Sequence, residues 1–367
     1  MRSRGWLLIL FLAVLGCQNV QPAVFEPLPT PELQVVISVL DDAIAPTTTP
    51  IVLPTSAHTS TPVSAAEPSA TPMPYVAGEG IYTIGWISDP QHYSAKFPAF
   101  YDSMTEFLRD EQESMRLAYV IHTGDLVNKT DSEEQWAVAV RAQANLDDIP
   151  NGVLAGNHDC QKPLLFEAYS KHFGEKKYKH KPWYGGSYQD NRGHYDLLTI
   201  GETEYLFVYM SFGPDNGCIK WLNKVFSKYP DRIAFLCLHD YFTNEQTRSA
   251  DGEKLFQKVV KKNPNIRFVL CGHRYGALLV TDELDDNGDK TPDRTVYQMM
   301  FNYQAAGSQG GDGYLRLLQI DETNRTMRVL TYSPALRDFN RFDDPTLREE
   351  RYDFDESAEE FVLPLPW

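Results

Sequence analysis

Basic residues are in the minority in this chain of 367 residues, and that shortage argues against one class of function. The chain has 34 Lys and Arg against 50 Asp and Glu, which gives a formal net charge of −16 at pH 7. A protein that coats nucleic acid carries a basic surface stripe, so no such role is expected here. A small anionic substrate is still compatible with this charge, because a bound metal ion can reverse the local field.

The first apolar run is too short to cross a bilayer comfortably. It covers residues 6–15 and follows Arg2 and Arg4, which is the charge pattern of an N-terminal targeting signal. The run ends in Leu15-Gly16-Cys17, which resembles a bacterial lipobox. We therefore predict a lipoprotein-type signal peptide over residues 1–17, lipidation of Cys17, export, and anchoring on the outer face of the cell membrane or cell envelope. The alternative is an ordinary secretory signal with an incidental Cys.

Cysteine is also rare, with five in the whole chain. Cys237 and Cys271 lie in, or at the end of, apolar strand-like runs and are predicted to be buried thiols. Cys160 and Cys218 lie in or beside polar loops. In an exported protein these two either form a disulfide or stay free, and the sequence favours neither outcome.

Composition divides the chain into parts. Residues 18–78 are rich in Pro, Thr, Ser and Ala, cannot bury enough apolar surface to fold, and are predicted to form a disordered stalk. Residues 79–335 are predicted to form the folded domain. Residues 336–367 are acidic and are predicted to be an extension packed on or near that domain.

Strand-like and helical stretches alternate through the first half of the domain, which indicates βαβ units and a sheet covered by helices on both faces. Later runs have the turn signals of a second, mostly antiparallel sheet. The expected strands are residues 81–87, 117–121, 152–155, 188–200, 203–210, 233–238, 266–270, 278–284, 295–301, 314–320 and 328–332.

Several of these strand-like runs end in side chains that can bind metal ions. In α/β sheets, ligands bind at the carboxyl ends of the strands. Oxygen and imidazole donors suit Mn²⁺, Zn²⁺ or Fe ions. Two such ions, roughly 3.5–4 Å apart, can activate a water for phosphoryl displacement. Each residue alone is explained as well by a turn or a helix cap, so their shared position carries the prediction. The residues are Asp89 and Gln91, Asp125, Asn157 and His158, His239, and His273.

The series Asp-x-Gln, Gly-Asp, Gly-Asn-His-Asp, His and Gly-His, in this order and spacing, resembles the calcineurin-like metallophosphoesterase superfamily. Its most specific parts are Gly124-Asp125 and Gly156-Asn157-His158-Asp159. The resemblance implies an α/β fold, a four-layered α/β/β/α sandwich of two mixed β-sheets flanked by helices. It also implies a metal-dependent phosphoesterase that hydrolyses phosphomono- or phosphodiesters by attack of activated water. The cofactors would be two divalent or mixed-valence ions of Mn, Zn or Fe.

The resemblance also implies a role for each matching residue. Asp89 and Gln91 would bind the first metal, and Asp125 would bridge both metals. Asn157, His239 and His273 would bind the second metal. His158 would face the substrate phosphate, where it would stabilise charge or protonate the leaving group. Asp159 would orient His158.

Two positions depart from the family pattern. Gln91 stands where His is usual and offers only a neutral carbonyl oxygen. Tyr275 replaces the second His of the usual Gly-His-x-His motif, and a phenol with a pKa near about 10 is a poor ligand for Zn²⁺ or Mn²⁺ at neutral pH. The first metal site is therefore expected to be impaired. Two alternatives follow: a mononuclear hydrolase, and a catalytically degenerate scaffold that acts as a surface binding lipoprotein.

Three residues are candidates for contact with a small or polymeric phosphoester. Arg192 could pair with a phosphate, His194 could reach the site, and Tyr275 lies two residues after His273. Residues 285–293 resemble part of a calcium loop, but Lys290 stands where such loops have Gly, so a hairpin turn is expected.

Overall fold

The computed structural model describes Tyr75, residues 78–162, 164–307, 309–340 and 356–365, and Trp367. The predicted signal peptide, its lipidation site Cys17 and nearly all of the predicted stalk lie outside the described residues. Among the described residues, no helix is long and apolar enough to cross a membrane.

One sheet has the order β13-β12-β11-β1-β2-β3, with β14 also paired to β12. Strands β1, β2 and β3 run parallel, and β11 and β12 add an antiparallel half on the other side of β1. The C-terminal β14 is antiparallel to β12, so the end of the chain adds to this sheet. The bounds are β1 Ile81–Ile87, β2 Leu117–His122, β3 Asn151–Val153, β11 Leu315–Asp321, β12 Thr326–Ser333, β13 Asp338–Phe339 and β14 Phe361–Pro364.

The second sheet has the order β4-β5-β6-β7-β8-β10-β9. Strands β6, β7, β8 and β10 run parallel, and β4, β5 and β9 are antiparallel to their neighbours. Both sheets are therefore mixed. The bounds are β4 Tyr184–Tyr188, β5 Gly193–Ile200, β6 Thr203–Met210, β7 Ile233–Leu238, β8 Ile266–Cys271, β9 Gly276–Leu284 and β10 Arg294–Asn302.

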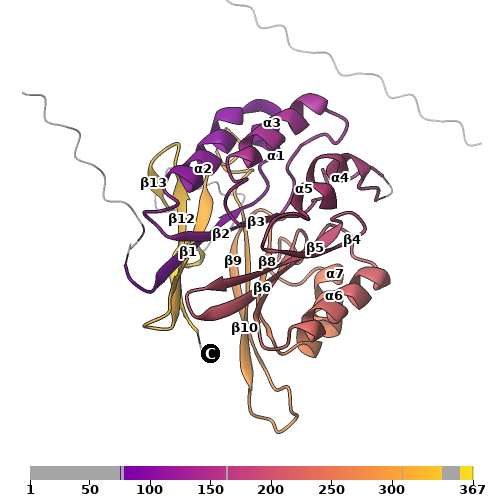
Figure 1. Ribbon diagram of the computed structural model, residues 1–367, viewed down its shortest axis with the longest axis vertical. Coiled ribbons are helices and arrows are strands. Elements are labelled where there is room, and N and C mark those ends of the chain that lie inside the picture. The colour runs from indigo at the N-terminus through magenta and orange to yellow at the C-terminus, as the bar shows by residue number, and fades with distance from the viewer. Residues whose placement is uncertain (1–74, 76–77, 163, 308, 341–355, 366) are drawn as a thin grey trace, which may run out of the picture. The chain divides into compact units, whose positions relative to one another are not determined.

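The two sheets pack on each other, and helices cover their outer faces (Figure 1). Along β6, Phe207 and Tyr209 are buried between the sheets, whereas Leu206 and Val208 are buried under α6 and α7. This alternation follows from the two-residue period of a strand. A third cluster joins the first sheet to α2 and α3. The predicted four-layered sandwich is therefore confirmed. The helices are α1 Gln91–Lys96, α2 Pro98–Asp110, α3 Glu133–Ala144, α4 Glu167–Phe173, α5 Glu175–Tyr178, α6 Asn216–Lys228 and α7 Ala250–Lys258, with 3₁₀ turns η1 Val260–Lys262 and η3 Glu356–Ala358.

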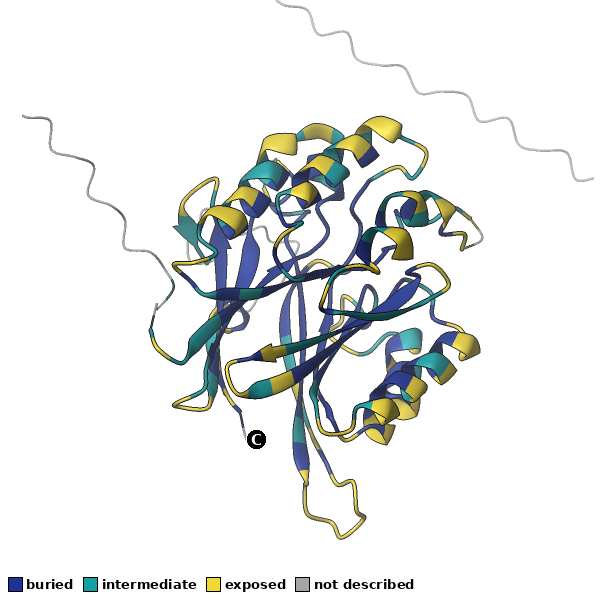
Figure 2. Ribbon diagram, in the orientation of Figure 1, coloured by how far each residue is buried: buried dark blue, intermediate teal, exposed yellow. Residues whose placement is uncertain are grey.

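Helix α6 shows how the sequence builds the outer layer. The side chain of Asp215 accepts a hydrogen bond from the Cys218 backbone N–H and caps the helix. Ile219, Leu222 and Phe226 recur at helical spacing and are buried on one face. Figure 2 shows the same pattern, with a dark inner face and an exposed outer face. Burying each such side chain stabilises the fold by about 1.5–3 kcal/mol.

Cys160 and Cys218 do not form a disulfide, so the free-thiol alternative holds in this structure. Cys218 is buried in the core beneath α6. The Cys160 thiol, in the loop after β3, instead donates a hydrogen bond to the Asn157 carbonyl oxygen at 3.4 Å. Cys237 and Cys271 are buried, as predicted.

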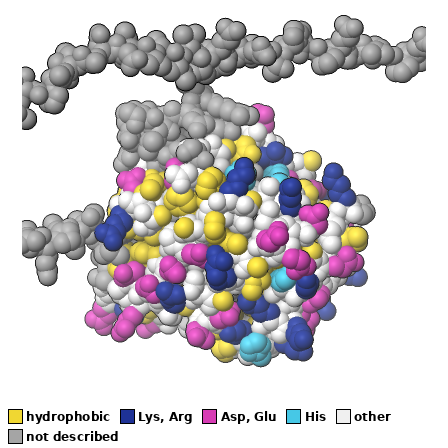
Figure 3. All heavy atoms as spheres, turned by 90° about the horizontal axis from the view of Figure 1, so that it is seen from above, with side chains coloured by type: hydrophobic (Ala, Val, Ile, Leu, Met, Phe, Trp, Pro, Cys, Tyr) yellow, Lys and Arg dark blue, Asp and Glu magenta, His cyan; other side chains and the backbone are white. Residues whose placement is uncertain are grey.

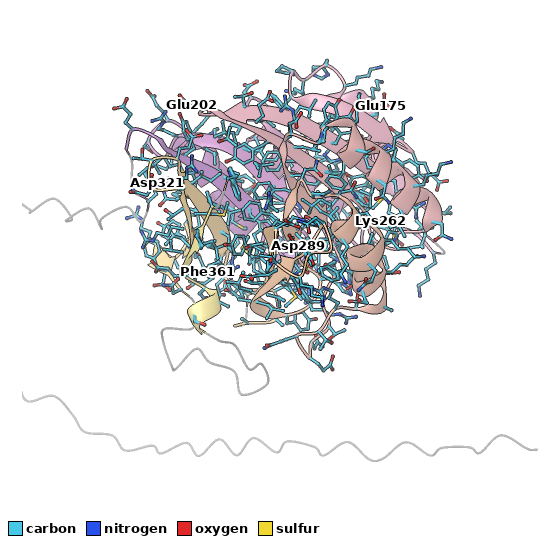
Figure 4. The ribbon with its side chains drawn as sticks, turned by 90° about the horizontal axis from the view of Figure 1, so that it is seen from below. Glu175, Glu202, Lys262, Asp289, Asp321 and Phe361 are labelled. Carbon is cyan, nitrogen blue, oxygen red and sulfur yellow. The ribbon has the colours of Figure 1, made fainter. Side chains whose placement is uncertain are left out.

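Residues 285–293 form the tip of the β9–β10 hairpin, as expected, and Asp289 marks this tip in Figure 4. The side chains of the tip accept backbone hydrogen bonds within the turn: Asp293 from Asp286, and Asp285 from Gly288 and Lys290. These bonds explain the acidic composition of the segment as turn chemistry.

Candidate metal centre

The loops that follow β1, β2, β3, β7 and β8 come together at the carboxyl ends of the parallel strands. Three residues of these loops have left-handed backbone conformations, with φ of 53° at Asp89, 56° at Asp125 and 69° at His273. Such conformations are costly for residues other than glycine and cluster at functional sites.

Two glycines allow these loops to approach one another. A Cβ atom on Gly156 would lie 2.0 Å from Asp125 Oδ1. A Cβ atom on Gly272 would lie 2.1 Å from Asp89 Oδ2 and 2.1 Å from Ser88 Oγ. Any side chain at either position would displace a carboxylate. This close approach accounts for the glycines that precede Asn157 and His273.

Ligand atoms of Asp125, His239 and His273 all lie within 4.8 Å of one another. Asp125 and His239 are fully buried, and His273 is half-buried. The Nδ1 atom of His239 is 2.8 Å from the Thr123 carbonyl oxygen. A carbonyl only accepts, so Nδ1 carries the proton and Nε2 points into the cluster, which is the arrangement of a metal-binding histidine.

Asn157 joins this cluster through its side-chain oxygen. Its Oδ1 atom is 3.0 Å from His239 Nε2, and Asp125 Oδ1 is 3.4 Å from the same nitrogen. Two oxygens and an imidazole nitrogen therefore face one point. This donor set suits Mn²⁺, Zn²⁺ or Fe.

Asp89 is oriented by a chain of buried hydrogen bonds. The Trp86 indole N–H donates to Thr123 Oγ1 at 3.0 Å, and Thr123 donates to Ser88 Oγ at 2.6 Å. Ser88 donates in turn to Asp89 Oδ2 at 2.5 Å. The His273 backbone N–H also lies 3.1 Å from both oxygens of Asp89. These hydrogen bonds fix the carboxylate of Asp89.

Gln91 begins helix α1, because the chain turns at Asp89-Pro90. Its Nε2 atom donates to Asp125 Oδ2 at 3.0 Å. Its Oε1 atom is buried and has no hydrogen-bond partner among the described residues. A buried, unpartnered carbonyl oxygen is unfavourable unless a cation or an ordered water binds it. The residues therefore fit a metal on this side as well.

The charges of the cluster lead to the same conclusion. Burial raises the pKa of Asp89 to about 7; the nearby Asp125 charge adds to this rise, and His239 opposes it. Burial lowers the pKa of His239, but the charges of Asp125 and Asp89 and the hydrogen bond to Asp125 outweigh it and raise the pKa to about 10. The two buried carboxylates thus retain a proton on His239, in the place where a metal ion would supply positive charge.

His158 and Asp159 differ in what they contact. The His158 ring is held by the Asn128 carbonyl oxygen, 2.9 Å from Nδ1, and its backbone N–H donates to Asp125 Oδ1. Asp159 is fully buried, and its carboxylate accepts three backbone N–H groups, from Leu126, Val127 and Gly156. The prediction that Asp159 orients His158 is therefore wrong. Its carboxylate turns inward and joins the two loops that carry Asp125 and Asn157.

Two of the three predicted substrate residues lie away from the cluster. Arg192 forms an ion pair with Asp215 at 3.1 Å and donates to the Gly213 carbonyl oxygen. His194 is buried between the sheets, where its ring stacks on Tyr209 at 4.3 Å, and burial lowers its pKa to about 3. Both placements correct the prediction. Arg192 pairs with Asp215 and does not line the pocket over the cluster, and the strand period of β5 directs His194 into the core.

Tyr275 does line the pocket over the cluster, and 38% of its surface is exposed. Asn244, Arg274 and Gln304 line the same pocket. Sequence reasoning assigned none of these three a role. Asn244 and Gln304 lie in loops without a periodic signal, whereas Arg274 could have been found from its position between His273 and Tyr275.

Comparison with known families gives a match over the same region. A family model described as calcineurin-like phosphoesterase matches residues 82–275, just over half of the chain. Uncharacterized protein YvnB of Bacillus subtilis (strain 168) is 46% identical over 269 residues, which cover 72% of this chain and 21% of the relative. The chain thus spans about a fifth of that relative's length.

Solved structures give weaker likenesses. The protein TT1561 of Thermus thermophilus is 13% identical with a TM-score of 0.43, over 69% of this chain and 99% of that one. Sulfate thiohydrolase SoxB of Thermus thermophilus is 12% identical with a TM-score of 0.41, over 72% of this chain and 58% of that one.

Proposed function

Because the chain belongs to the calcineurin-like phosphoesterase family, we propose that it is a metal-dependent phosphoesterase that acts at the pocket lined by Asp125, His158 and His273. The observation that carries the proposal is the convergence of Asp125, His239 and His273 within 4.8 Å. The unpartnered oxygen of Gln91 supports it independently.

The residues divide into two sets of candidate ligands. Asp89 and Gln91, with Asp125, would hold the first metal. Asn157, His239 and His273, again with Asp125, would hold the second. Bound divalent ions of this kind polarise a phosphoryl oxygen and generate a nucleophile from water. We expect the first set to bind its metal more weakly, because Tyr275 stands where the family pattern has a second His.

We assign His158 the role of protonating the leaving group. Its Nδ1 atom is engaged by the Asn128 carbonyl oxygen, which leaves Nε2 available on a side chain that lines the pocket. In the imidazolium form, Nε2 would give its proton to the ester oxygen as the bond from that oxygen to phosphorus breaks. The Asn128 carbonyl would stabilise the positive ring.

Turnover of p-nitrophenyl phosphate and bis(p-nitrophenyl) phosphate tests the proposal. The full chain is stripped with chelator and assayed with and without added Mn²⁺. We expect hydrolysis of at least one ester only with Mn²⁺, and its loss in Asp125→Asn. Asp102→Asn is the matched control, because Asp102 pairs with Arg141 on the surface of α2 and α3. Absence of Mn²⁺-dependent turnover of either ester would support the degenerate binding scaffold instead.

Export and lipid anchoring are also part of the proposal, and they rest on the sequence of residues 1–17 alone. The test is incorporation of labelled palmitate into the chain expressed in a bacterium. Wild type should carry the label and Cys17→Ser should not. An unlabelled wild type in the medium would favour the ordinary secretory signal.

One face of the molecule is consistent with a small substrate rather than a long polyanion. On the face seen in Figure 3, acidic and basic side chains are interspersed. This face therefore offers no continuous basic stripe of the kind that tracks a nucleic-acid backbone.

A further inference from the structure

Arg274 lies beside the metal cluster, and its guanidinium group is unpaired among the residues that the structure describes. It follows His273 in the connection between β8 and β9, and it is half-buried. Its Nε atom is buried and has no hydrogen-bond partner, and no described carboxylate lies within ion-pair distance of the group. Buried arginine is normally paired. Arg294, for example, binds Asp286 and two backbone carbonyls.

Two carboxylates lie near Arg274, and neither neutralises it through an ion pair. The charge of Arg274 acts on Asp240 and on Glu245. Neither of these carboxylates comes within ion-pair distance of the guanidinium, so its charge is still available to a ligand in the pocket.

The pocket that Arg274 lines is small and polar. Its volume is about 120 Å³, far below the range of about 300–1,000 Å³ that is usual for drug-sized ligands. Asn244, from the loop after β7, lines the same pocket, and so does Tyr275, which follows Arg274 in the chain and is exposed. A compact anion with several oxygens fits such a pocket, because a guanidinium presents its N–H donors in a planar fork.

We propose that Arg274 and Asn244 form an anion subsite that receives the non-bridging oxygens of the phosphoryl group and makes the protein selective for phosphomonoesters. This proposal rests on the proposed phosphoesterase function and adds the substrate class. A phosphomonoester carries a charge of about −1.5 to −2 at pH 7, whereas a diester carries about −1. An unpaired cation therefore favours the monoester. The second substituent of a diester would also need space that the small pocket lacks.

The first test compares two esters on the full chain loaded with Mn²⁺. We expect Arg274→Gln to lower kcat/KM for p-nitrophenyl phosphate by about 10–100-fold, the loss typical of a hydrogen bond to a charged group. The value for bis(p-nitrophenyl) phosphate should change by less than about 3-fold. Arg274→Lys should recover part of the difference, because it restores the charge but not the planar fork. Arg141→Gln, on the surface pair with Asp102, is the matched control and should leave the ratio unchanged.

The second test does not depend on turnover. Inorganic phosphate is titrated calorimetrically into the Mn²⁺-loaded chain, and metal content is measured in the same samples. Arg274→Gln should weaken phosphate binding by about 10–100-fold with the same metal content. The subsite is overturned if Arg274→Gln lowers kcat/KM equally for both esters, or if it leaves phosphate binding unchanged. No turnover of either ester by wild type, with phosphate binding still dependent on Arg274, would count against the proposed hydrolysis and not against the subsite.

Discussion

The Asp125 carboxylate oxygen Oδ1 lies 3.4 Å from Nε2 of His239, and both side chains are buried. Their interaction raises the pKa of His239 to about 10, against the effect of burial. Burial alone would raise the pKa of Asp125, but the charge and hydrogen bond of His239, together with those of His158, outweigh burial and lower it. The metal-free cluster therefore carries a proton on the nitrogen that a metal ion would bind.

Metal binding should therefore release a proton. Below about pH 10 the ion must displace the proton from His239, so its apparent association constant should rise with pH, by up to about tenfold per unit. Calorimetric titration of Zn²⁺ in buffers of different ionisation enthalpy measures the protons released. We expect about one proton per ion at pH 7.5. A value near zero would contradict the protonated cluster.

The same proton affects the stability of the metal-free chain. A raised folded-state pKa stabilises the fold fully below the unfolded value of 6.5, and the contribution is lost as pH rises through about 10. The stability of the chelator-treated chain should thus fall between pH 6.5 and pH 10. Denaturant unfolding at the two pH values, with His239→Gln for comparison, measures this effect. The free energy of unfolding should fall less in His239→Gln than in wild type. An equal fall in both proteins would mean that other groups cause the effect.

Thr123 should control metal affinity without touching the metal. Thr123→Val removes the hydroxyl that links Trp86 to Ser88 and leaves Ser88 free to turn away from Asp89. Loss of such an outer contact typically weakens metal affinity by about 10–100-fold. Competition with a fluorescent chelator gives the affinity. Thr331→Val is the control, because Thr331 is also buried and donates to the Glu359 carbonyl oxygen in the first sheet. If both variants bind metal like wild type, the chain of hydrogen bonds does not act on the site.

Asp159→Asn should destabilise the fold. One carboxylate oxygen becomes an NH₂ donor facing backbone donors, which leaves at least one N–H group from Leu126, Val127 or Gly156 unsatisfied. The expected cost is about 1–3 kcal/mol, measured by denaturant unfolding with chelator present. Asp215→Asn keeps an acceptable helix cap and should cost less than about 1 kcal/mol. Unchanged stability with lost turnover in Asp159→Asn would restore the catalytic interpretation.

His158→Gln should lower turnover without removing metal. The loss of a positioned proton donor lowers kcat by about 10²–10⁴-fold. Metal content should equal that of wild type, because His158 contacts the cluster through its backbone N–H. His172→Gln is the control, because His172 stacks on Trp136 in the outer layer of helices. Loss of metal in His158→Gln would make His158 a ligand.

The strand pattern predicted much of the site for a physical reason. The carboxyl ends of parallel strands meet at one edge of a sheet, so residues that follow those strands are brought together. Asp125, Asn157, His239 and His273 are far apart in sequence, yet they lie in one cluster for this reason. Gly156 and Gly272 are visible in the sequence motifs, but the reason for them, that a Cβ atom would meet a carboxylate, is seen only in the structure.

The direction of individual side chains, and their contacts with residues far away in the chain, could not be predicted from the sequence. His194 was expected near the site, but only the register of β5 shows that it faces the core between the sheets. Asp159 looked like a partner for its neighbour His158, yet its carboxylate binds backbone groups that lie more than 30 residues earlier in the chain at Leu126 and Val127. The position of Arg274 between His273 and Tyr275 can be read from the sequence. Its lack of an ion-pair partner among the described residues is seen only in the structure.

The metal content per chain is the measurement that tests this account most directly. Elemental analysis is made on the full chain, purified without chelator, for wild type and for Tyr275→His. We predict at least one transition-metal ion in wild type. If the first site is impaired, the content should rise from one ion to two in Tyr275→His; two ions already in wild type would mean that the present residues complete both sites. If neither protein contains a bound ion, the proposed metal-dependent hydrolysis is wrong, and the catalytically degenerate binding scaffold is favoured instead.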